Sequence, residues 1–465
     1  MLDRCFKAYD VRATYPEPLN EEGAWSMGYA TARFLSDRAQ EQGLDSPGMR
    51  HIVVGRDMRR SSPSLARALM DGMLDFGANV IDIGLVDTPA VYFAINHFGA
   101  AGGVQVTASH NPAQYNGFKV SQVKARPVGQ GTGLERIRQH AAGATRSTAE
   151  REGGMHAERD IWQAYRSHLL RLLDPCYQDG SRKVRIAIDA SNGMAGVAVP
   201  KIFSGLPGLE IEAINFDTSR GEFVHEPNPL VEANLAQVRE AVVRGKADFG
   251  VCFDGDADRC MVIDEQGTPI GCDLMLAAMV GRALKPNPGA AVVYDLRSSR
   301  SVPEAIREAG GEPIESRVGH VFMKAALAQT AAPIGGELSG HFYFADLWNT
   351  DSGVRAFIEV LNLLASNGRT LSASVAPFRR YAQSGEINFE NADTAGTLER
   401  LKVRYATASM KELDGLSLDT GAWWANIRRS NTEPLLRLNL EARDAAAVGA
   451  ALAELEPMLG HRVDH

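Results

Sequence analysis

The sequence of 465 residues is 45% hydrophobic and 23% charged, an ordinary globular composition with enough length for several domains. Its net charge of −8 excludes a general attraction to nucleic acid or acidic lipid, so the positive charge that binds an anionic substrate has to be local. No apolar run reaches the roughly 18 residues of a membrane span, and MLDRCFKAYDVR lacks the core of a signal peptide. Because the five cysteines form no CxxC pair, we expect a cytoplasmic protein with reduced thiols.

Three segments repeat the order of strand, polar loop and amphipathic helix, at 51–74, 184–203 and 290–310. This alternation predicts parallel βαβ units. Each segment is followed by a second strand that ends in an unusual polar loop: QVTASHNP (105–112), FGVCFDGDADR (249–259) and APIGGELSGH (332–341). The sequence therefore predicts three related α/β domains with mixed sheets and a functional loop at the same place in each.

The pattern changes in the last part of the chain. GEINFEN reads as a strand, residues 394–410 as a helix, and residues 423–442 as strand, loop and strand. These elements predict a small C-terminal α+β domain. The expected domains are 1–152, 153–266, 267–376 and 377–465, and the expected fold class is α/β.

The loop DGDADR is the strongest single indication of chemistry. Asp254, Asp256 and Asp258 alternate along it, and carboxylates crowded this closely repel one another unless a cation lies among them. Oxygen ligands suit Mg²⁺ or Ca²⁺. One alternative is a solvated acidic turn, and another is an EF-hand, because Glu265 is the twelfth residue from Asp254. The sixth position, however, is Arg259 where an EF-hand needs glycine, which favours a metal loop on an α/β scaffold.

Three other loops carry polar groups that could act as a nucleophile or bind a sugar or a phosphate. In TASHNP, Ser109 follows an apolar run, where a nucleophile could lie, although Ser, Asn and Pro are ordinary turn formers and the local sequence alone favours a turn. In GGELSGH, Glu337 and Ser339 suit neighbouring sugar hydroxyls, although glycine-rich turns are common. In RRSNTEPLLR, a guanidinium, hydroxyls and an amide suit a phosphate, with a capped turn as the alternative.

Together, TASHNP, DGDADR, GELSGH and RRSNTEP occur in this order with wide and even spacing. In this arrangement the chain resembles the α-D-phosphohexomutase superfamily, specifically its phosphomannomutase/phosphoglucomutase branch. The similarity runs from FKAYDVR (6–12) to the region of residue 437. It implies four domains around a central cleft, each donating one loop, and it makes Ser109 the counterpart of the family's phosphoserine.

The resemblance also implies a set of site residues. Mg²⁺ is expected at Asp254, Asp256 and Asp258 together with one phosphoserine oxygen at Ser109. The expected catalytic residues are Ser109, His110, Lys119, Arg259, His341 and Arg12. The expected substrate-binding residues are Tyr9, Arg297, His320, Glu337, Ser339, Arg428, Ser430, Asn431, Thr432 and Arg437, and Lys324 resembles a further family residue near the substrate.

The function implied by the resemblance is that of a phosphomannomutase, which interconverts mannose 6-phosphate and mannose 1-phosphate. A hexose 1,6-bisphosphate is the expected intermediate and activator, and glucose phosphates are an expected second substrate pair. The partners are then small-molecule hexose phosphates, with no nucleic acid, membrane or obligate protein partner. Open alternatives are a phosphoglucomutase as the main activity, a phosphosugar phosphatase, and a catalytically inactive sugar-phosphate sensor.

Two positions depart from the family pattern. Ala13 follows Arg12 where relatives usually have glycine, which reduces the backbone freedom expected of the N-terminal loop. Arg297 replaces the lysine that is common in relatives, and its forked contacts are expected to alter substrate preference.

Overall fold

The computed structural model describes residues 2–146, 153–430 and 435–463. They form two compact units, Met1–Gly271 with Ser339–Ser372, and Cys272–Leu338 with Ala373–His465. None of the helices in these described ranges has both the length and the apolar character that crossing a membrane requires. The five cysteines all lie in the same ranges and none of them forms a disulfide.

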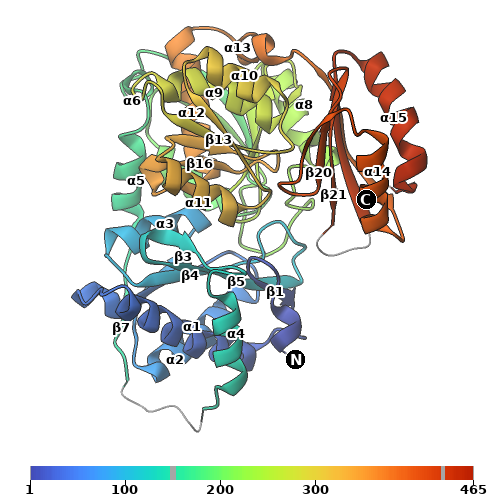
Figure 1. Cartoon of the computed structure of the whole chain (residues 1–465). Coiled ribbons are helices and arrows are strands. Elements are labelled where there is room, and N and C mark those ends of the chain that lie inside the picture. Colours follow the sequence, from blue (N-terminus) through green and yellow to red (C-terminus); the bar gives the residue numbers. More distant parts are fainter. Residues whose placement is uncertain (1, 147–152, 431–434, 464–465) are drawn as a thin grey trace. The chain divides into compact units, whose positions relative to one another are not determined.

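The first sheet of the first unit has the strand order β1-β5-β4-β2-β3-β7, with β6 paired to β5. Its strands are β1 (Val11–Thr14), β2 (His51–Arg56), β3 (Asn79–Leu85), β4 (Gly102–Val106), β5 (Tyr115–Gln122), β6 (Arg126–Pro127) and β7 (His156–Glu158). Figure 1 shows α1 (Glu21–Glu41), α2 (Ser62–Phe76) and α4 (Leu134–Gly143) on one face of this sheet and α3 (Thr88–His97) on the other.

Glycines allow α1 and α2 to pack closely. A Cβ atom at Gly28 would lie 1.9 Å from the carbonyl oxygen of Leu69, and one at Gly72 would lie 2.0 Å from that of Trp25. Neither helix could therefore carry a larger residue at these positions without moving away from its neighbour.

The second sheet of the first unit has the order β12-β11-β10-β8-β9. Its strands are β8 (Val184–Asp189), β9 (Leu209–Ile214), β10 (Phe249–Phe253), β11 (Cys260–Asp264) and β12 (Pro269–Ile270). The helices that follow or separate these strands are α5 (Trp162–Leu170), α6 (Pro175–Gln178), α7 (Ala195–Phe203) and α8 (Ala236–Gly245).

The chain returns to the first unit after residue 338. This returning segment contains the antiparallel pair β16 (Phe342–Phe344) and β17 (Thr350–Asp351), followed by α12 (Gly353–Asn367). Every residue of α12 from Gly353 to Leu364 is buried. The ring of Phe357 lies 5.2 Å from that of Phe203 and 6.0 Å from that of Phe249, so α12 is part of the core of the second sheet's domain.

The second unit begins with a third set of alternating elements. The strands β13 (Ala291–Asp295), β14 (Glu312–Ser316) and β15 (Ile334–Gly336) are parallel, with β13 in the middle. The accompanying helices are α9 (Cys272–Leu284), α10 (Ser301–Glu308) and α11 (His320–Thr330). The chain leaves the first unit for the last time within α13 (Leu371–Val375).

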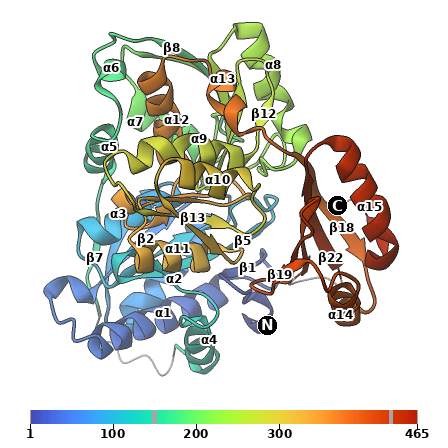
Figure 2. The ribbon, with the colours of Figure 1, turned by 45° about the horizontal axis from the view of Figure 1, so that its top comes forward.

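The C-terminal part of the second unit is an antiparallel sheet of order β19-β20-β21-β22-β18-β23. Its strands are β18 (Ala382–Glu390), β19 (Ser409–Lys411), β20 (Leu416–Asp419), β21 (Trp423–Arg429), β22 (Leu435–Ala442) and β23 (His461–Val463). Figure 2 shows α14 (Thr394–Arg404) and α15 (Ala445–Leu459) beside this sheet. Residues such as Ile387, Ile427 and Leu438 fill the core that these elements share.

The predicted threefold repeat and the α/β fold class are confirmed. In each α/β domain the first strand pairs in parallel with the strand that carries the functional loop: β2 with β4, β8 with β10, and β13 with β15. The helix predicted over 394–410 is too long, because α14 ends at Arg404 and residues 409–411 form β19. Alanine and methionine in ATASM favour a helix, so tertiary contacts end it here: Tyr405 packs edge-on against Trp423, and residues 409–411 pair with β20. The four domain ranges and the central cleft stay predictions.

Candidate active site

Ser109 lies in the loop that joins β4 to β5 and is only 2% exposed. Its φ of 48° is in the left-handed region, which costs an L-residue about 1–2 kcal/mol. The backbone N–H of Ser109 donates to Oγ1 of Thr107 at 2.9 Å, and its own Oγ donates to Oδ2 of Asp254 at 2.8 Å. The strained backbone therefore directs the hydroxyl toward the acidic loop.

The acidic loop joins β10 to β11 and presents the carboxylate cluster, which we define as Asp254, Asp256 and Asp258. The three side chains belong to residues that are at most 1% exposed, and each offers a carboxylate oxygen within 4.8 Å of the other two. Gly255 lets the two loops approach, because a Cβ atom there would lie 2.3 Å from the carbonyl oxygen of Ser109.

Two cations face the carboxylate cluster. Lys119, on β5, donates from Nζ to Oδ2 of Asp256 at 2.7 Å and to Oδ2 of Asp258 at 2.5 Å. Arg259 donates from Nε to Oδ2 of Asp254 at 3.2 Å. Burial, together with the neighbouring carboxylates, raises the pKa of Asp254 well above its ordinary value. For Asp258, burial also opposes ionisation, but the cationic Lys119 outweighs it and the pKa falls below the ordinary value.

The carboxylate cluster fits a divalent cation. Oδ1 of Asp256 and Oδ1 of Asp258 are buried, and neither has a hydrogen-bond partner among the described residues. Buried anionic oxygens without donors are costly unless a cation binds them. Hard oxygen ligands of this kind suit Mg²⁺, so the residues present match the predicted metal.

His110 belongs to the loop that carries Ser109, and Arg12 contacts this loop. Arg259 donates a hydrogen bond to Nδ1 of His110, which lies 3.4 Å from Oγ of Ser109. Burial, reinforced by Arg259, lowers the pKa of His110 well below its ordinary value, so the ring is neutral. Arg12, on β1, donates to Oδ1 of Asn111 at 2.6 Å. The structure thus brings both predicted residues to the Ser109 loop.

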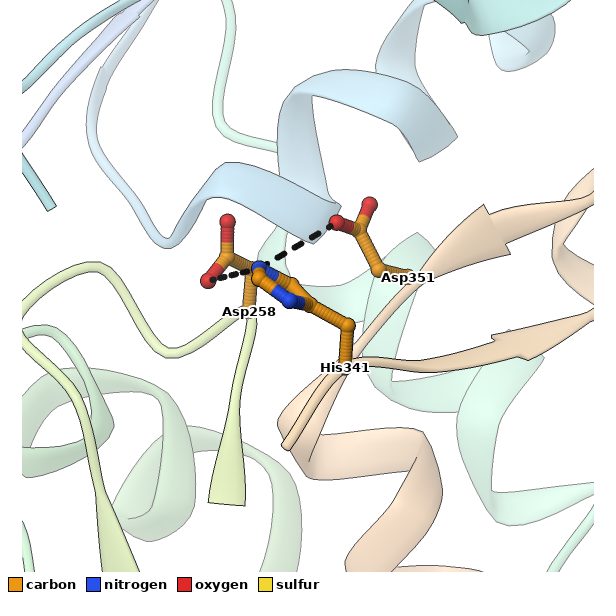
Figure 3. Close-up of side chains that lie close together, drawn as sticks. All are labelled: Asp258, His341 and Asp351. Atoms are coloured by element: carbon orange, nitrogen blue, oxygen red, sulfur yellow. Dashed lines mark ion pairs between the residues drawn. The ribbon is translucent and has the colours of Figure 1, made fainter. Parts of the chain in front are cut away.

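His341 reaches the carboxylate cluster from the returning segment, and its backbone forms a bridge with that of Arg259. Figure 3 shows its Nε2 between two carboxylates, 3.6 Å from Oδ1 of Asp258 and 3.9 Å from Oδ2 of Asp351. Burial lowers the pKa of His341 to about 4 despite these acids. Its Nδ1 lies 2.8 Å from Oγ of Ser339. His341 is therefore a neutral, oriented imidazole at neutral pH.

Three of the predicted substrate-binding residues form the arginine cluster of the second unit, which we define as Arg297, Arg428 and Arg437. Arg428 and Arg437 are paired residues of β21 and β22, and both donate to Glu386 on β18, at 3.1 and 3.0 Å. Nη1 of Arg297 lies 3.6 Å from the same carboxylate, while its other nitrogens bind Asp295. The three guanidiniums outweigh burial and lower the pKa of Glu386.

The remaining predicted substrate-binding residues lie in separate segments of the chain. Glu337 follows β15, is 2% exposed, and accepts the backbone N–H of Gly319 at 2.7 Å. His320 begins α11 and Lys324 lies one turn later on the same helix. Tyr9 is half-buried in the turn before β1. Ser430 ends the described part of the loop after β21, whereas Asn431 and Thr432 lie outside the described residues.

Three polar residues at these two clusters were not predicted from the sequence. Thr88, at the start of α3, donates to Oδ2 of Asp256 at 2.5 Å, and Asp351 faces His341. Glu386 holds the arginine cluster together. The alternation in GEINFEN puts Glu386 on the polar face of its strand, so the strand pattern carries no signal that this residue binds arginines.

The chain is similar to a known protein family along most of its length. The profiles of the family described as phosphoglucomutase/phosphomannomutase match at alpha/beta/alpha domain I over residues 3–146, domain II over 163–267, domain III over 273–381, and the C-terminal domain over 386–457. The chain belongs to the phosphoglucomutase/phosphomannomutase family. It is therefore an enzyme of the phosphohexomutase type, an isomerase.

Individual relatives agree with this assignment. This phosphohexomutase is 38% identical over 459 residues to "Phosphohexose mutases" of Xanthomonas campestris pv. campestris (strain B100), covering 98% of each chain. It is 36% identical over 448 residues to "Phosphomannomutase" of Escherichia coli (strain K12), covering 94% of this chain and 95% of the relative. A crystal structure of a phosphoglucomutase/phosphomannomutase family protein from Burkholderia thailandensis is similar to it, with a TM-score of 0.86, 30% identity, and coverage of 98% and 96%.

Proposed function

We propose that this phosphohexomutase interconverts mannose 6-phosphate and mannose 1-phosphate through a phosphoserine at Ser109 and a hexose 1,6-bisphosphate intermediate. The observation that carries the proposal is the 2.8 Å contact between Oγ of Ser109 and the carboxylate cluster. A serine hydroxyl held beside a cation site is suited to carry a phosphoryl group, because the main requirements of phosphoryl transfer are alignment and charge neutralisation.

Each transfer step forms one phosphorus–oxygen bond and breaks another. A free hydroxyl oxygen of the sugar phosphate forms a bond to phosphorus, the bond to Oγ of Ser109 breaks, and the hydroxyl proton passes to a base. The bisphosphate then turns end for end, and its other phosphoryl group returns to Ser109 by the reverse step. The same bisphosphate, supplied from solution, would act as activator by loading Ser109.

The groups around Ser109 suit this chemistry. Asp254, Asp256 and Asp258 would hold Mg²⁺, which would neutralise charge on the transferred group. Arg259 adds a fixed positive charge 3.5 Å from Oγ of Ser109. His341, whose imidazole is neutral, is a candidate for the base, and Lys119, which two aspartates hold as a cation, is a candidate for the acid that returns a proton.

The arginine cluster suits the phosphate group that is not being transferred. Arginine forks match phosphate oxygens, and we propose that Arg297, Arg428 and Arg437 bind that group together with Ser430, Asn431 and Thr432. Tyr9, Arg12 and His320 are proposed as further substrate contacts. This assignment rests on the resemblance of the RRSNTEP motif and on the excess of positive charge in the cluster.

Dual sugar specificity is part of the proposal. Glu337 and Ser339 are expected to bind O3 and O4, which mannose and glucose present identically, whereas the two sugars differ only at C2. A site without a C2 contact cannot discriminate strongly. We expect kcat/KM for mannose 1-phosphate and glucose 1-phosphate to agree within about a hundredfold, or about 2.7 kcal/mol. A preference beyond about a thousandfold would mean that another residue reads C2.

The product formed from mannose 1-phosphate tests the proposed function. Phosphorus NMR distinguishes three outcomes in the presence of Mg²⁺ and glucose 1,6-bisphosphate. Formation of mannose 6-phosphate supports the mutase. Release of inorganic phosphate at the same rate as substrate loss would make the protein a phosphatase, and unchanged substrate would favour a sugar-phosphate sensor.

A further inference from the structure

Arg59 is a charged side chain in the interior of the first unit that the proposed chemistry does not use. It lies just after β2, in the sequence DMRR, and is 0% exposed. A guanidinium carries five N–H donors and cannot shed its proton in a protein, so its burial is tolerated only when those donors are satisfied.

The donors of Arg59 converge on the loop that carries Ser109. Nη2 donates to the carbonyl oxygens of Ser109 at 2.8 Å and Asn111 at 2.7 Å. Nη1 donates to those of Pro112 at 2.7 Å and Tyr115 at 3.0 Å. One side chain thus binds four carbonyl groups within seven residues of backbone, most of which belong to neither strand.

Asp57 in turn fixes the position of Arg59. Its Nε and its backbone N–H both donate to the carboxylate of Asp57, each at 3.0 Å. The same carboxylate accepts from Oγ1 of Thr107 at 2.8 Å, and that hydroxyl oxygen accepts the backbone N–H of Ser109. The guanidinium also lies 5.0 Å from the centre of the Phe223 ring. Arg59, Asp57 and Thr107 therefore hold the peptide groups on both sides of Ser109.

These hydrogen bonds stabilise the unusual backbone conformation of Ser109. Ser109 has a positive φ, and an L-residue keeps such a conformation only where the surroundings determine it. A Lys side chain at position 59 would keep the positive charge, but its single nitrogen carries three donors and could not bind four carbonyl oxygens and a carboxylate at once. The forked guanidinium group of arginine, and not its positive charge alone, is what binds the four carbonyl oxygens of the loop.

We infer that Arg59 is a positioning residue for phosphoryl transfer: it fixes the Ser109 loop so that Oγ keeps its alignment in both transfer steps. This inference rests on the proposed function, in which Ser109 carries the phosphoryl group. The guanidinium of Arg59 binds carbonyl oxygens of the loop and not the Ser109 hydroxyl, so it acts through the backbone. Loss of the fork should therefore lower the rate of transfer more than the affinity for substrate.

The test compares Arg59→Lys with Arg60→Lys. Arg60 is the adjacent residue, but its exposed side chain binds the carbonyl of Arg220 and the carboxylate of Glu222 instead of the loop. With mannose 1-phosphate and saturating glucose 1,6-bisphosphate, we expect Arg59→Lys to lower kcat about a hundredfold, with KM within about threefold of the wild type. Single-turnover phosphorylation of Ser109 by the bisphosphate, followed by intact mass, should slow by a similar factor. Arg60→Lys should match the wild type in both measurements.

Wild-type kcat in a folded Arg59→Lys enzyme would overturn the inference, as would a rise in KM alone. If Arg59→Lys does not fold, Thr107→Val decides, because it removes the hydroxyl that links Asp57 to the N–H of Ser109; the inference then requires a loss in kcat and not only in unfolding temperature. A wild-type enzyme whose Ser109 never carries phosphate would instead contradict the proposed function, which keeps the two failures distinct.

Discussion

In the carboxylate cluster of the first unit three aspartates face two cations, whereas in the arginine cluster of the second unit three guanidiniums face two carboxylates. The excess charge is negative in one and positive in the other. Each excess matches a ligand of opposite sign, a divalent cation in the first case and a phosphate in the second.

Burial distinguishes the two clusters further. The side chains of Asp254 and Asp256 are 0% exposed, whereas those of Glu386 and Arg437 are 26% and 29% exposed. The side chains of Arg297 and Arg428 are only 8% exposed, so it is the charges of Glu386 and Arg437 that water screens more strongly than those of the carboxylate cluster. Changes at the buried aspartates should therefore have larger effects than a change at the partly exposed Glu386, and the following predictions test this order.

The largest effect is expected for Ser109→Ala. If Ser109 carries the phosphoryl group, the variant loses the fraction of protein that is about 80 Da heavier, and its activity falls at least about a thousandfold. Intact mass spectrometry and a coupled assay measure the two losses. Ser64→Ala, on α2, is the control and should retain both. Near-normal turnover by Ser109→Ala would contradict the assignment.

The next effect concerns stability and pH. Burial raises the pKa of Asp87, the neighbour of the Thr88 that binds Asp256, to about 7 from the ordinary 3.8. The folded state then binds more protons than the unfolded state between these values, so stability falls as pH rises from about 4 to about 7 and levels off above. Asp87→Asn should remove this fall, which amounts to about 4 kcal/mol at most. Urea unfolding at several pH values without Mg²⁺ measures the difference.

Tyr165→Phe provides a control for the Asp87 prediction. The Tyr165 hydroxyl donates to Oδ2 of Asp87 at 3.2 Å and stabilises its ionised form. Removing it should steepen the dependence on pH, in the opposite direction to Asp87→Asn. Identical pH profiles for all three proteins would show that Asp87 has an ordinary pKa.

The third prediction is about Mg²⁺. Asp256→Asn keeps the shape of the side chain but removes one negative charge and one anionic oxygen, so Mg²⁺ affinity should fall about a hundredfold. Isothermal titration calorimetry on the wild type and the variant gives the ratio. Asp248→Asn, at an exposed position before β10, should bind like the wild type. Unchanged affinity in Asp256→Asn would place the metal elsewhere.

The smallest effect is expected at the arginine cluster. Glu386→Gln removes a carboxylate that competes with phosphate for Arg428 and Arg437, so inorganic phosphate should inhibit about fivefold more strongly, corresponding to about 1 kcal/mol. Glu308→Gln, which alters an exposed carboxylate bound by Arg380, is the matched control. Weaker inhibition in Glu386→Gln would mean that this carboxylate organises the arginines more than it competes with the ligand.

The repeated α/β domains were predictable because strand, loop and helix recur in the same order, and apolar periodicity records that order directly. The carboxylate cluster was also predictable, since its members are neighbours in one short loop. The partners of these groups were not. In DMRR two arginines are adjacent, and only the fold decides that Arg59 is buried and Arg60 exposed. Glu386 is separated from Arg428 by about forty residues, and the pairing of β18, β22 and β21 brings them together.

The return of the chain to the first unit limits how this protein can be divided. A gene fragment that ends at residue 271 encodes both sheets of that unit but omits α12, whose Phe357 packs on Phe203 and Phe253. Such a fragment would expose these rings to water and would be prone to aggregation and proteolysis. Expression of a soluble piece of this enzyme therefore requires residues 339–372 to be supplied as well, either fused by a linker or as a complementing peptide.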